Sequence, residues 1–371
     1  MTPAKRRGEL VTWSEIAINV GLVIGFSTGL MFTNMADDLK WRYMFGLGGV
    51  LPFIMIILVL TIMPESPRWL VSKGRDSEAR QILAKVYPPG FDVELVVNDI
   101  KEAIEREETA EHATGWGVLF APTPAFRRML LVGIGTAIAQ QAVGVDAIQY
   151  YMLDIIQASS LETTRQDGIL VVLGLIKLVF IVVGGKLFDR TGRRPLFFVS
   201  LLGMTVALLV VSFAFFFHPN LSGGFTVFGL GVYVAFFSIG MGPGAWLVPS
   251  EVFATCIRAK AMSLATFANR IVATIMSSTF LSTGDAMGWG GFFLLLAVIC
   301  LMVLAFLYTY LPETKGRSLE DMSIYFAEIT GDKSILEEEA RIIRRREEKK
   351  TKISSGDAEA SPLQSEGAEV L

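Results

Sequence analysis

Apolar runs of about 20 residues recur along this chain, and they restrict its fold more than any other feature. A helix needs roughly 20 apolar residues to cross the ~30 Å hydrocarbon core of a bilayer, because each residue adds about 1.5 Å. Of the 371 residues, 52% are hydrophobic and only 19% are charged, which argues against a soluble protein. We therefore predict an all-α membrane protein. Its eight predicted membrane helices cover about residues 14–36, 42–63, 130–156, 168–188, 195–217, 225–248, 262–283 and 288–310.

The lysines and arginines between these helices gather on one side of the predicted membrane. They precede the first helix in KRR (5–7) and follow the even-numbered helices, as in RTGRR (190–194), whereas the other loops hold few. Cytoplasmic loops carry such an excess, so we expect both termini in the cytoplasm. The first apolar run is long and lacks a small-residue cleavage site, which favours a membrane helix over a cleaved signal peptide.

The two ends of the apolar region look like copies of each other. KRRGEL (5–10) precedes two predicted helices that end at MPESPR (63–68), and TCIRAKAM (255–262) precedes two that end at LPETKGR (311–317). Four further helices precede the second copy, and none precedes the first. This symmetry predicts an N-terminally truncated version of a twelve-helix protein, and we expect the 371-residue chain not to transport by itself.

Two segments outside the apolar runs are predicted to be short cytoplasmic helices. DSEARQILAKVY (76–87) places Ala79, Ile82, Leu83 and Val86 at helical spacing, and residues 93–111 form a second, charged pattern. The tail over 333–371 begins with a stretch rich in Glu, Arg and Lys, which predicts a frayed helix, and its end is predicted to be disordered.

One predicted membrane helix carries far more polar residues than packing requires. QQAVGVDAIQYY (140–151) follows the apolar MLLVGIGTAIA, and each polar group left unpaired in hydrocarbon costs several kcal/mol. The amides of Gln140 and Gln141 suit a ligand rich in hydroxyl groups, although glutamine also links helices in membranes. Gly144 predicts a bend or break of the helix there.

Several ordered motifs resemble the sugar porter family of the major facilitator superfamily. They are PESPRWL (64–70), QQxxGxxAxxYY (140–151), FDRTGRRPL (188–196), GPGAW (242–246), SEVFATCIRAKAM (250–262) and PETKGRSLEDM (312–322). The resemblance implies two six-helix bundles and an alternating-access cycle. Residues 1–63 would supply the last two helices of the N-terminal bundle, 64–128 a cytoplasmic linker, 129–311 the C-terminal bundle and 312–371 the cytoplasmic tail.

The resemblance also implies two sets of functional residues. The substrate-binding set is Gln140, Gln141, Asp146, Tyr151, Lys177, Trp246 and Asn269. The cytoplasmic gate set, which would lock the inner mouth, is Glu65, Arg68, Asp189, Arg193, Arg194, Glu251, Arg258, Glu313 and Arg317. Each charge in the gate set, taken alone, is also compatible with a solvated loop, and Trp246 with an interfacial anchor.

Five positions depart from the pattern of the family's glucose uniporters. They are Glu15, Asp146, Lys177, Ser238 and Arg270, and together they resemble the polyol and inositol branch, which is typified by proton coupling. Asp146 and Lys177 lie in different predicted helices, so we expect an ion pair, a polar cavity lining, or both. Glu15 is a candidate proton carrier or gate residue.

The sequence therefore predicts transport of a monosaccharide or polyol by alternating access, with proton symport in a full-length form. The alternatives are a non-transporting sugar receptor and an inactive truncated product. An enzyme is not expected, because the two histidines, His112 and His218, lie outside the predicted helices. The expected partners are a small sugar or polyol, protons and the lipid bilayer, with no nucleic acid, cofactor or metal. The target membrane, plasma or vacuolar, is left open.

Overall fold

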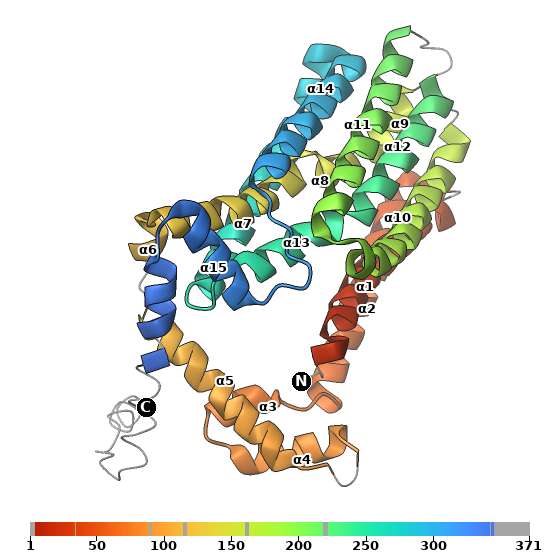
Figure 1. Ribbon diagram of the computed structural model, residues 1–371. Coiled ribbons are helices and arrows are strands. Elements are labelled where there is room, and N and C mark those ends of the chain that lie inside the picture. The colour runs from red at the N-terminus through yellow and green to blue at the C-terminus, as the bar shows by residue number, and fades with distance from the viewer. Residues whose placement is uncertain are drawn as a thin grey trace, which may run out of the picture. The chain divides into compact units, whose positions relative to one another are not determined.

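The computed structural model describes residues 4–33, 35–88, 91–113, 117–159, 163–217, 222–341 and 343–344. For helix residues 4–12, 14, 37, 106–113, 163–165, 189 and 222 it describes the backbone alone. The described residues are helical or irregular, with no strand among them (Figure 1). The predicted disordered end of the tail lies outside the described residues.

Fifteen helices are assigned in the described part of the chain. They are α1 (Ala4–Met31), α2 (Asp37–Thr61), α3 (Pro67–Ser72), α4 (Asp76–Val86), α5 (Val93–Ala113), α6 (Gly117–Phe120), α7 (Pro124–Ala142), α8 (Val145–Tyr150), α9 (Met152–Ala158), α10 (Thr163–Thr191), α11 (Arg193–Phe217), α12 (Ser222–Ile239), α13 (Met241–Val252), α14 (Arg258–Tyr310) and α15 (Leu319–Thr330). The sequence did not predict α15. They form two compact units, which we describe separately: residues 1–58, 128–253 and 259–322, and residues 59–127, 254–258 and 323–371.

The described helical segments include six that are long and apolar enough to cross a bilayer. The longest, α14, has 53 residues and would measure about 80 Å if straight, more than twice the hydrocarbon thickness. Gly288 interrupts it with φ 72° and ψ 152°, so α14 contains both predicted helices 262–283 and 288–310. The apolar part of α1, Glu15–Met31, is shorter than the predicted 14–36. The count of eight membrane helices stays a prediction.

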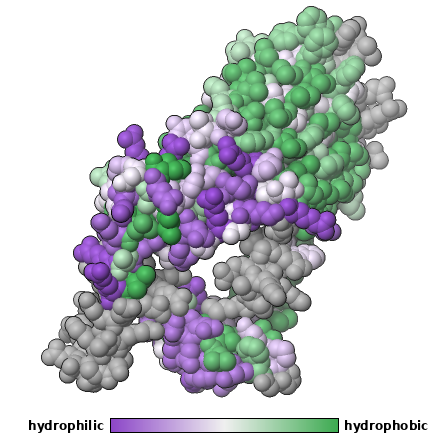
Figure 2. Space-filling view, viewed as in Figure 1, coloured by the Kyte–Doolittle hydropathy of each residue, from purple (hydrophilic) through white to green (hydrophobic). Residues whose placement is uncertain are grey.

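The long helices of the first unit are apolar on both their buried and their exposed faces. In α11, Phe197, Leu201 and Leu208 are buried, whereas Val206 and Phe213 are more than half exposed. Figure 2 shows hydrophobic side chains covering the outer surface of α11 and α12. An uncovered surface of this kind is stable in lipid rather than in water. Helices α11 and α12 lie side by side, α10 packs on α12, and α1 packs on α10.

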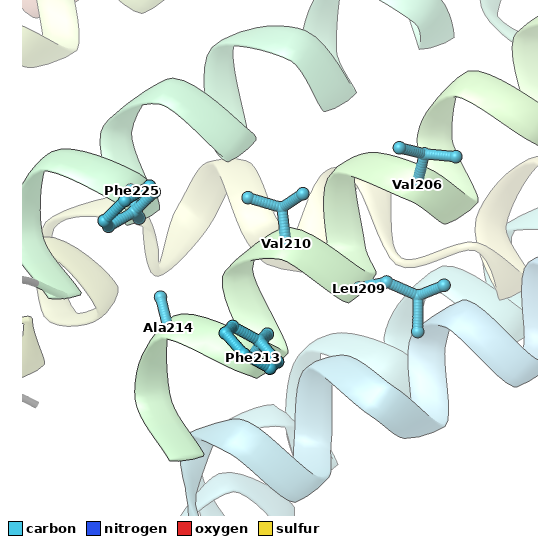
Figure 3. Close-up of a pocket in the computed structure, with 6 residues that line it drawn as sticks. All are labelled: Val206, Leu209, Val210, Phe213, Ala214 and Phe225. Carbon is cyan, nitrogen blue, oxygen red and sulfur yellow. The ribbon is translucent and has the colours of Figure 1, made fainter. Parts of the chain in front are cut away.

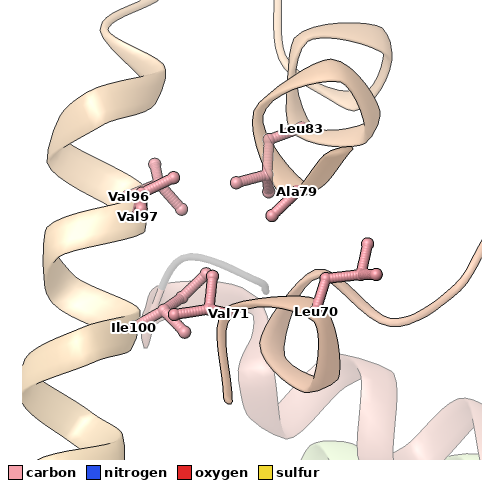
Figure 4. Close-up of a cluster of buried hydrophobic side chains, with 7 residues drawn as sticks. All are labelled: Leu70, Val71, Ala79, Leu83, Val96, Val97 and Ile100. Atoms are coloured by element: carbon pink, nitrogen blue, oxygen red, sulfur yellow. The ribbon is translucent and has the colours of Figure 1, made fainter. Parts of the chain in front are cut away.

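The second unit has a small hydrophobic core of its own (Figure 4). Its buried residues come from α3, α4 and α5 and are Leu70, Val71, Ala79, Leu83, Val96, Val97 and Ile100. The predicted helices over 76–87 and 93–111 are confirmed as α4 and α5. Ile82 packs against this core as expected, but Val86 is 68% exposed, because the helix ends there and Tyr87 packs in its place.

The tail residue Asp332 caps the start of α7 within the second unit. Its carboxylate accepts hydrogen bonds from the backbone N–H groups of Ser334 (3.0 Å) and Ala125 (3.1 Å), and the hydroxyls of Ser334 and Thr123 are 2.6 Å apart. The first N–H groups of a helix lack partners inside it, so a carboxylate there is stabilised. These hydrogen bonds, above all the one from the Ser334 N–H, lower the pKa of Asp332 from 3.8 to about 2. Partial burial acts in the opposite direction but is outweighed.

Asp332→Ala is expected to loosen the contact between the tail and the start of α7. Loss of a helix cap costs about 1 kcal/mol, so the amide of Ala125 should exchange its hydrogen faster in the variant. Because the pKa of Asp332 is lowered in the folded chain, its stabilisation is complete above pH 3.8 and disappears as the pH falls through about 2. Amide exchange at neutral pH measures the effect, with the exposed neighbour Lys333→Ala as control. Equal exchange in both variants would contradict the capping role.

Candidate functional site

A break between α7 and α8 creates the centre of the candidate site. Helix α7 ends at Ala142, and α8 begins at Val145 after Gly144, whose φ of +88° lies in the left-handed region. A side chain there would be strained, and a Cβ would come within 3.2 Å of Leu296. The predicted interruption at Gly144 is therefore confirmed. The Tyr233 hydroxyl, fully buried on α12, donates to the Val143 carbonyl at the break (3.0 Å).

Gln140, on the last turn of α7 before the break, forms a buried amide network with Asn269. The Gln140 Nε2 donates to the Gly242 carbonyl on α13 (2.8 Å), and the Asn269 Nδ2 donates to Gln140 Oε1 (3.0 Å) and the Ala137 carbonyl (2.7 Å). Gln140 is 6% exposed and Asn269 is fully buried. The network links α7, α13 and α14, so it fixes helix packing whatever else it does. It leaves the buried Oδ1 of Asn269 without a hydrogen-bond partner in the part of the chain that the structure describes.

Gln141 connects the end of α7 to the first turn of α8. Its Nε2 donates to Asp146 Oδ2 (2.9 Å), and the same carboxylate oxygen lies 3.7 Å from Arg270 Nη1 on α14. Gln141 is 3% exposed, whereas the side chains of Asp146 and Arg270 are 26% and 59% exposed. The carboxylate is thus held by one buried amide and one largely exposed cation.

Lys177 on α10 contacts Gln149 on α8, with 3.0 Å between Nζ and Oε1. The charges of Asp146 and of Glu15 on α1 both act on Lys177, but neither forms a direct ion pair with it. Of the two alternatives for Asp146 and Lys177, a direct ion pair is not found among the described contacts, and a shared polar cavity lining stays a prediction. Asp146 and Gln149 lie three positions apart on α8, and in the structure Asp146 approaches Arg270 on α14 while Gln149 contacts Lys177 on α10.

The aromatic residues of the predicted set lie close to the same helices. The Tyr151 ring stacks on Phe280 of α14, with centroids 5.1 Å apart and planes 12° apart. Trp246 is half-buried on α13, one turn after the Gly242 carbonyl that Gln140 contacts. Gly240 separates α12 from α13, just before the GPGAW motif that contains Trp246.

Part of the predicted gate set forms one cluster in the first unit. Arg193 donates to both carboxylate oxygens of Glu251, at 2.7 and 3.2 Å, and Thr314 donates to Glu251 at 2.6 Å. Glu313 accepts from the backbone N–H groups of Arg193 and Arg194 at the start of α11 (3.0 and 3.1 Å). Burial alone would raise the pKa of Glu313, but the N–H groups around it hold the pKa below its ordinary value.

Two further gate residues contact members of this cluster or their neighbours. Arg194, whose backbone N–H contacts Glu313, also donates from its guanidinium to the Tyr308 carbonyl (2.7 Å). Arg317 donates its backbone N–H to the Thr314 carbonyl. Glu65, Arg68 and Arg258 belong to the second unit. The side chain of Asp189 lies outside the described residues.

An apolar pocket on α11 and α12 is chemically unlike this site (Figure 3). It has a volume of about 480 Å³ and is lined by Val206, Leu209, Val210, Phe213, Ala214 and Phe225. Side chains of this kind offer no hydrogen bonds to hydroxyl groups. The pocket therefore suits hydrocarbon rather than a sugar.

The sequence missed two polar side chains of the site and one that supports it. Gln149 and Arg270 contact the predicted residues Lys177 and Asp146, and Tyr233 holds the helix break. The only sequence signal for Gln149 was its place in the polar stretch at 140–151. Tyr233 had a comparable signal, because it is a hydroxyl-bearing residue in the middle of an apolar run.

The bundle of apolar helices with a broken, amide-rich helix defines a multi-pass membrane protein of the major facilitator type. The solved structure of the MFS proton:xylose symporter XylE bound to 6-bromo-6-deoxy-D-glucose superposes with a TM-score of 0.68 and 27% identity, covering 88% of this chain and 68% of that one. The family model for "Sugar (and other) transporter" matches residues 1–326. The chain belongs to this sugar transporter family.

Two plant proteins are among the relatives of known sequence. "Probable polyol transporter 4" of Arabidopsis thaliana is 36% identical over 329 residues, which cover 88% of this chain and 62% of that protein. "Polyol transporter 5" of the same plant is 35% identical over 347 residues, which cover 88% of this chain and 64% of that protein. The chain thus spans slightly less than two thirds of the length of these relatives.

Proposed function

We propose that the function of this protein is transport of a monosaccharide or polyol across a membrane by alternating access, with the substrate bound around the break between α7 and α8. The observation that carries the proposal is the presence of Gln140, Gln141, Asp146, Lys177 and Asn269, each with polar contacts, inside an apolar helix bundle. Amides and charges in a membrane are costly, and they are retained where they line a polar path. The sugar and polyol transporters among the relatives support this reading.

Tyr151 and Trp246 complete the proposed site. Aromatic rings pack on the C–H faces of sugars, while the amides pair with hydroxyl groups. In this proposal the Arg193–Glu251–Glu313 cluster closes the cytoplasmic mouth when the site opens outward, and both termini are cytoplasmic. Glu65, Arg68, Asp189, Arg194, Arg258 and Arg317 are the remaining members of the proposed gate.

Proton coupling is the finer part of the proposal. Glu15 and Asp146 are carboxylates whose charges act on Lys177 from two sides, so a change in the charge of either would alter the field across the site. The structural neighbour XylE is titled a proton:xylose symporter, which supports symport as the mode of coupling. In this proposal Glu15 carries the proton or acts as a gate residue.

Gln141→Leu is expected to weaken substrate binding by about fivefold to 150-fold. Leucine keeps the bulk of the side chain but removes its amide, and each lost hydrogen bond to a buried group costs about 1–3 kcal/mol. Calorimetric titration of the purified chain with myo-inositol, glucitol and glucose measures the affinity. Gln157→Leu on the exposed end of α9 is the matched control. Unchanged affinity for the best of these probes would place the site elsewhere.

Uptake into liposomes that contain the chain tests transport itself. Saturable uptake of the best binder, competed by its unlabelled form and increased by an inward proton gradient, would support symport. Uptake that ignores the gradient would exclude proton coupling. Binding without uptake would favour a receptor or an inactive form over transport by this chain.

A further inference from the structure

The contact with Lys177 fixes the orientation of the Gln149 amide. The ammonium of lysine has three donors and no acceptor, so the Gln149 oxygen must face Nζ, at the observed 3.0 Å. The Nε2 group of Gln149 therefore faces away from Lys177. It is buried and has no hydrogen-bond partner among the described residues. An amide flip would not relieve this, because it would oppose one donor group to another.

The Asn269 amide leaves the opposite kind of group unpaired. Its Nδ2 donates to Gln140 Oε1 and to the Ala137 carbonyl, whereas its buried Oδ1 is an acceptor with no partner among the residues that the structure describes. Buried polar atoms in folded proteins are nearly all paired, and each exception needs an explanation. One unpaired donor and one unpaired acceptor are the two groups that hydroxyls of a ligand can satisfy, since a hydroxyl both donates and accepts.

Helix packing alone does not explain why a glutamine occupies position 149 with its N–H group buried and unpaired among the described residues. A glutamine that only links α8 to α10 needs its oxygen for Lys177, and an apolar or acidic residue would avoid a buried unpaired N–H. Gln149 also lies three residues from Asp146 and five from Gly144, on the short helix that the break sets apart. Its free donor therefore belongs to the same segment as the proposed substrate contacts.

We propose that Gln149 is a specificity-determining residue, whose Nε2 donates a hydrogen bond to one hydroxyl oxygen of a polyhydroxylated ligand. Lys177 acts as the positioning residue that aims this donor. The inference rests on the proposed function, since it assigns a further contact to the same substrate site. It predicts that Gln149 contacts one hydroxyl of the ligand, and that a variant without the Gln149 amide no longer distinguishes a ligand that has this hydroxyl from one that lacks it.

Two variants of Gln149 separate donation to the ligand from support of the fold. Gln149→Glu keeps an oxygen for Lys177 and removes the donor while adding a negative charge, whereas Gln149→Met removes both groups at similar bulk and adds no charge. Calorimetric titration with the tightest of myo-inositol, glucitol and glucose should show about tenfold weaker binding to both variants. Gln157→Met is the matched control and should bind as the parent chain does.

Deoxy analogues of the same probe identify the hydroxyl concerned. The analogue that lacks it should bind the parent chain about tenfold more weakly than the probe, yet bind Gln149→Met as well as the probe does. Thermal unfolding measured in parallel should show Gln149→Glu folded, because its contact with Lys177 is kept.

The outcomes separate this inference from the proposed function. If Gln141→Leu weakens binding while both Gln149 variants stay within about twofold of the parent, the inference is overturned and the proposed site stands. Equal losses for every deoxy analogue in parent and variant would also overturn it. If no probe binds the parent chain, the proposed function fails, and this inference fails with it.

Discussion

Gly184→Ala is expected to destabilise the first unit by about 3 kcal/mol, because α10 and α12 approach each other there through their backbones. A Cβ on Gly184 would lie 2.7 Å from the Ser238 carbonyl oxygen and 2.8 Å from that of Ile239. Backbone atoms cannot rotate aside as a side chain does, so the two helices would have to separate. Small residues serve this purpose widely in membrane helix interfaces.

The matched control for this prediction is Gly168→Ala on the same helix. Nothing lies within 4 Å of a Cβ at Gly168, and alanine favours a helix over glycine by about 1 kcal/mol. A thiol-reactive dye can follow thermal unfolding in detergent, since Cys256 and Cys300 are both buried. Gly168→Ala should unfold at or above the parent midpoint, and Gly184→Ala several degrees below it. If both variants unfold together, the close approach is not a determinant of stability.

Arg193→Ala is expected to cost about 2–4 kcal/mol, between the values for exposed and fully buried ion pairs. The side chain is 13% exposed and donates to Glu251 twice and to the Phe188 carbonyl once. Its removal leaves Glu251, which is 25% exposed, with Thr314 as its remaining partner among the described contacts. The cost comes mainly from a carboxylate left without its cation in a partly desolvated place.

A second substitution tests this explanation directly. Glu251→Gln in the Arg193→Ala background removes the stranded charge, so the double variant should be more stable than Arg193→Ala alone. The exposed Arg190→Ala, on the preceding turn of the chain, should unfold like the parent. A double variant that is less stable than Arg193→Ala would mean that Glu251 has other favourable contacts and that the ion pair is not the main cause.

The contrast between two ion pairs in this chain explains why Arg193 is the informative choice. Arg75 and Glu78 also approach to 2.7 Å, but their side chains are 48% and 49% exposed. Water and salt screen such a pair, which contributes little to stability. Equal distances therefore correspond to unequal energies, and burial decides between them.

The sequence by itself determined the family, the apolar helices and the position of the main helix break. Gly144 shows why the break could be predicted. The break needs a backbone conformation with positive φ, and glycine is the residue type that adopts it without strain. The pattern of Ala79, Ile82 and Leu83 likewise predicted α4, because helical spacing is a local property. The family could also be predicted from the sequence, because its motifs are short stretches of fixed residue types and spacing.

Only the tertiary structure decided which polar groups meet. The sequence offered Asp146 and Lys177 as a pair of opposite charges, but in the structure Asp146 and Gln149, which share the short helix α8, contact different neighbours. Arg270 and Gln149 thereby became the contacts of Asp146 and Lys177. Contact between charges depends on the angle and offset between three separate helices, and side-chain packing sets that arrangement. The spacing of residues within one helix does not predict it. The same packing leaves the Gln149 donor and the Asn269 acceptor buried and unpaired.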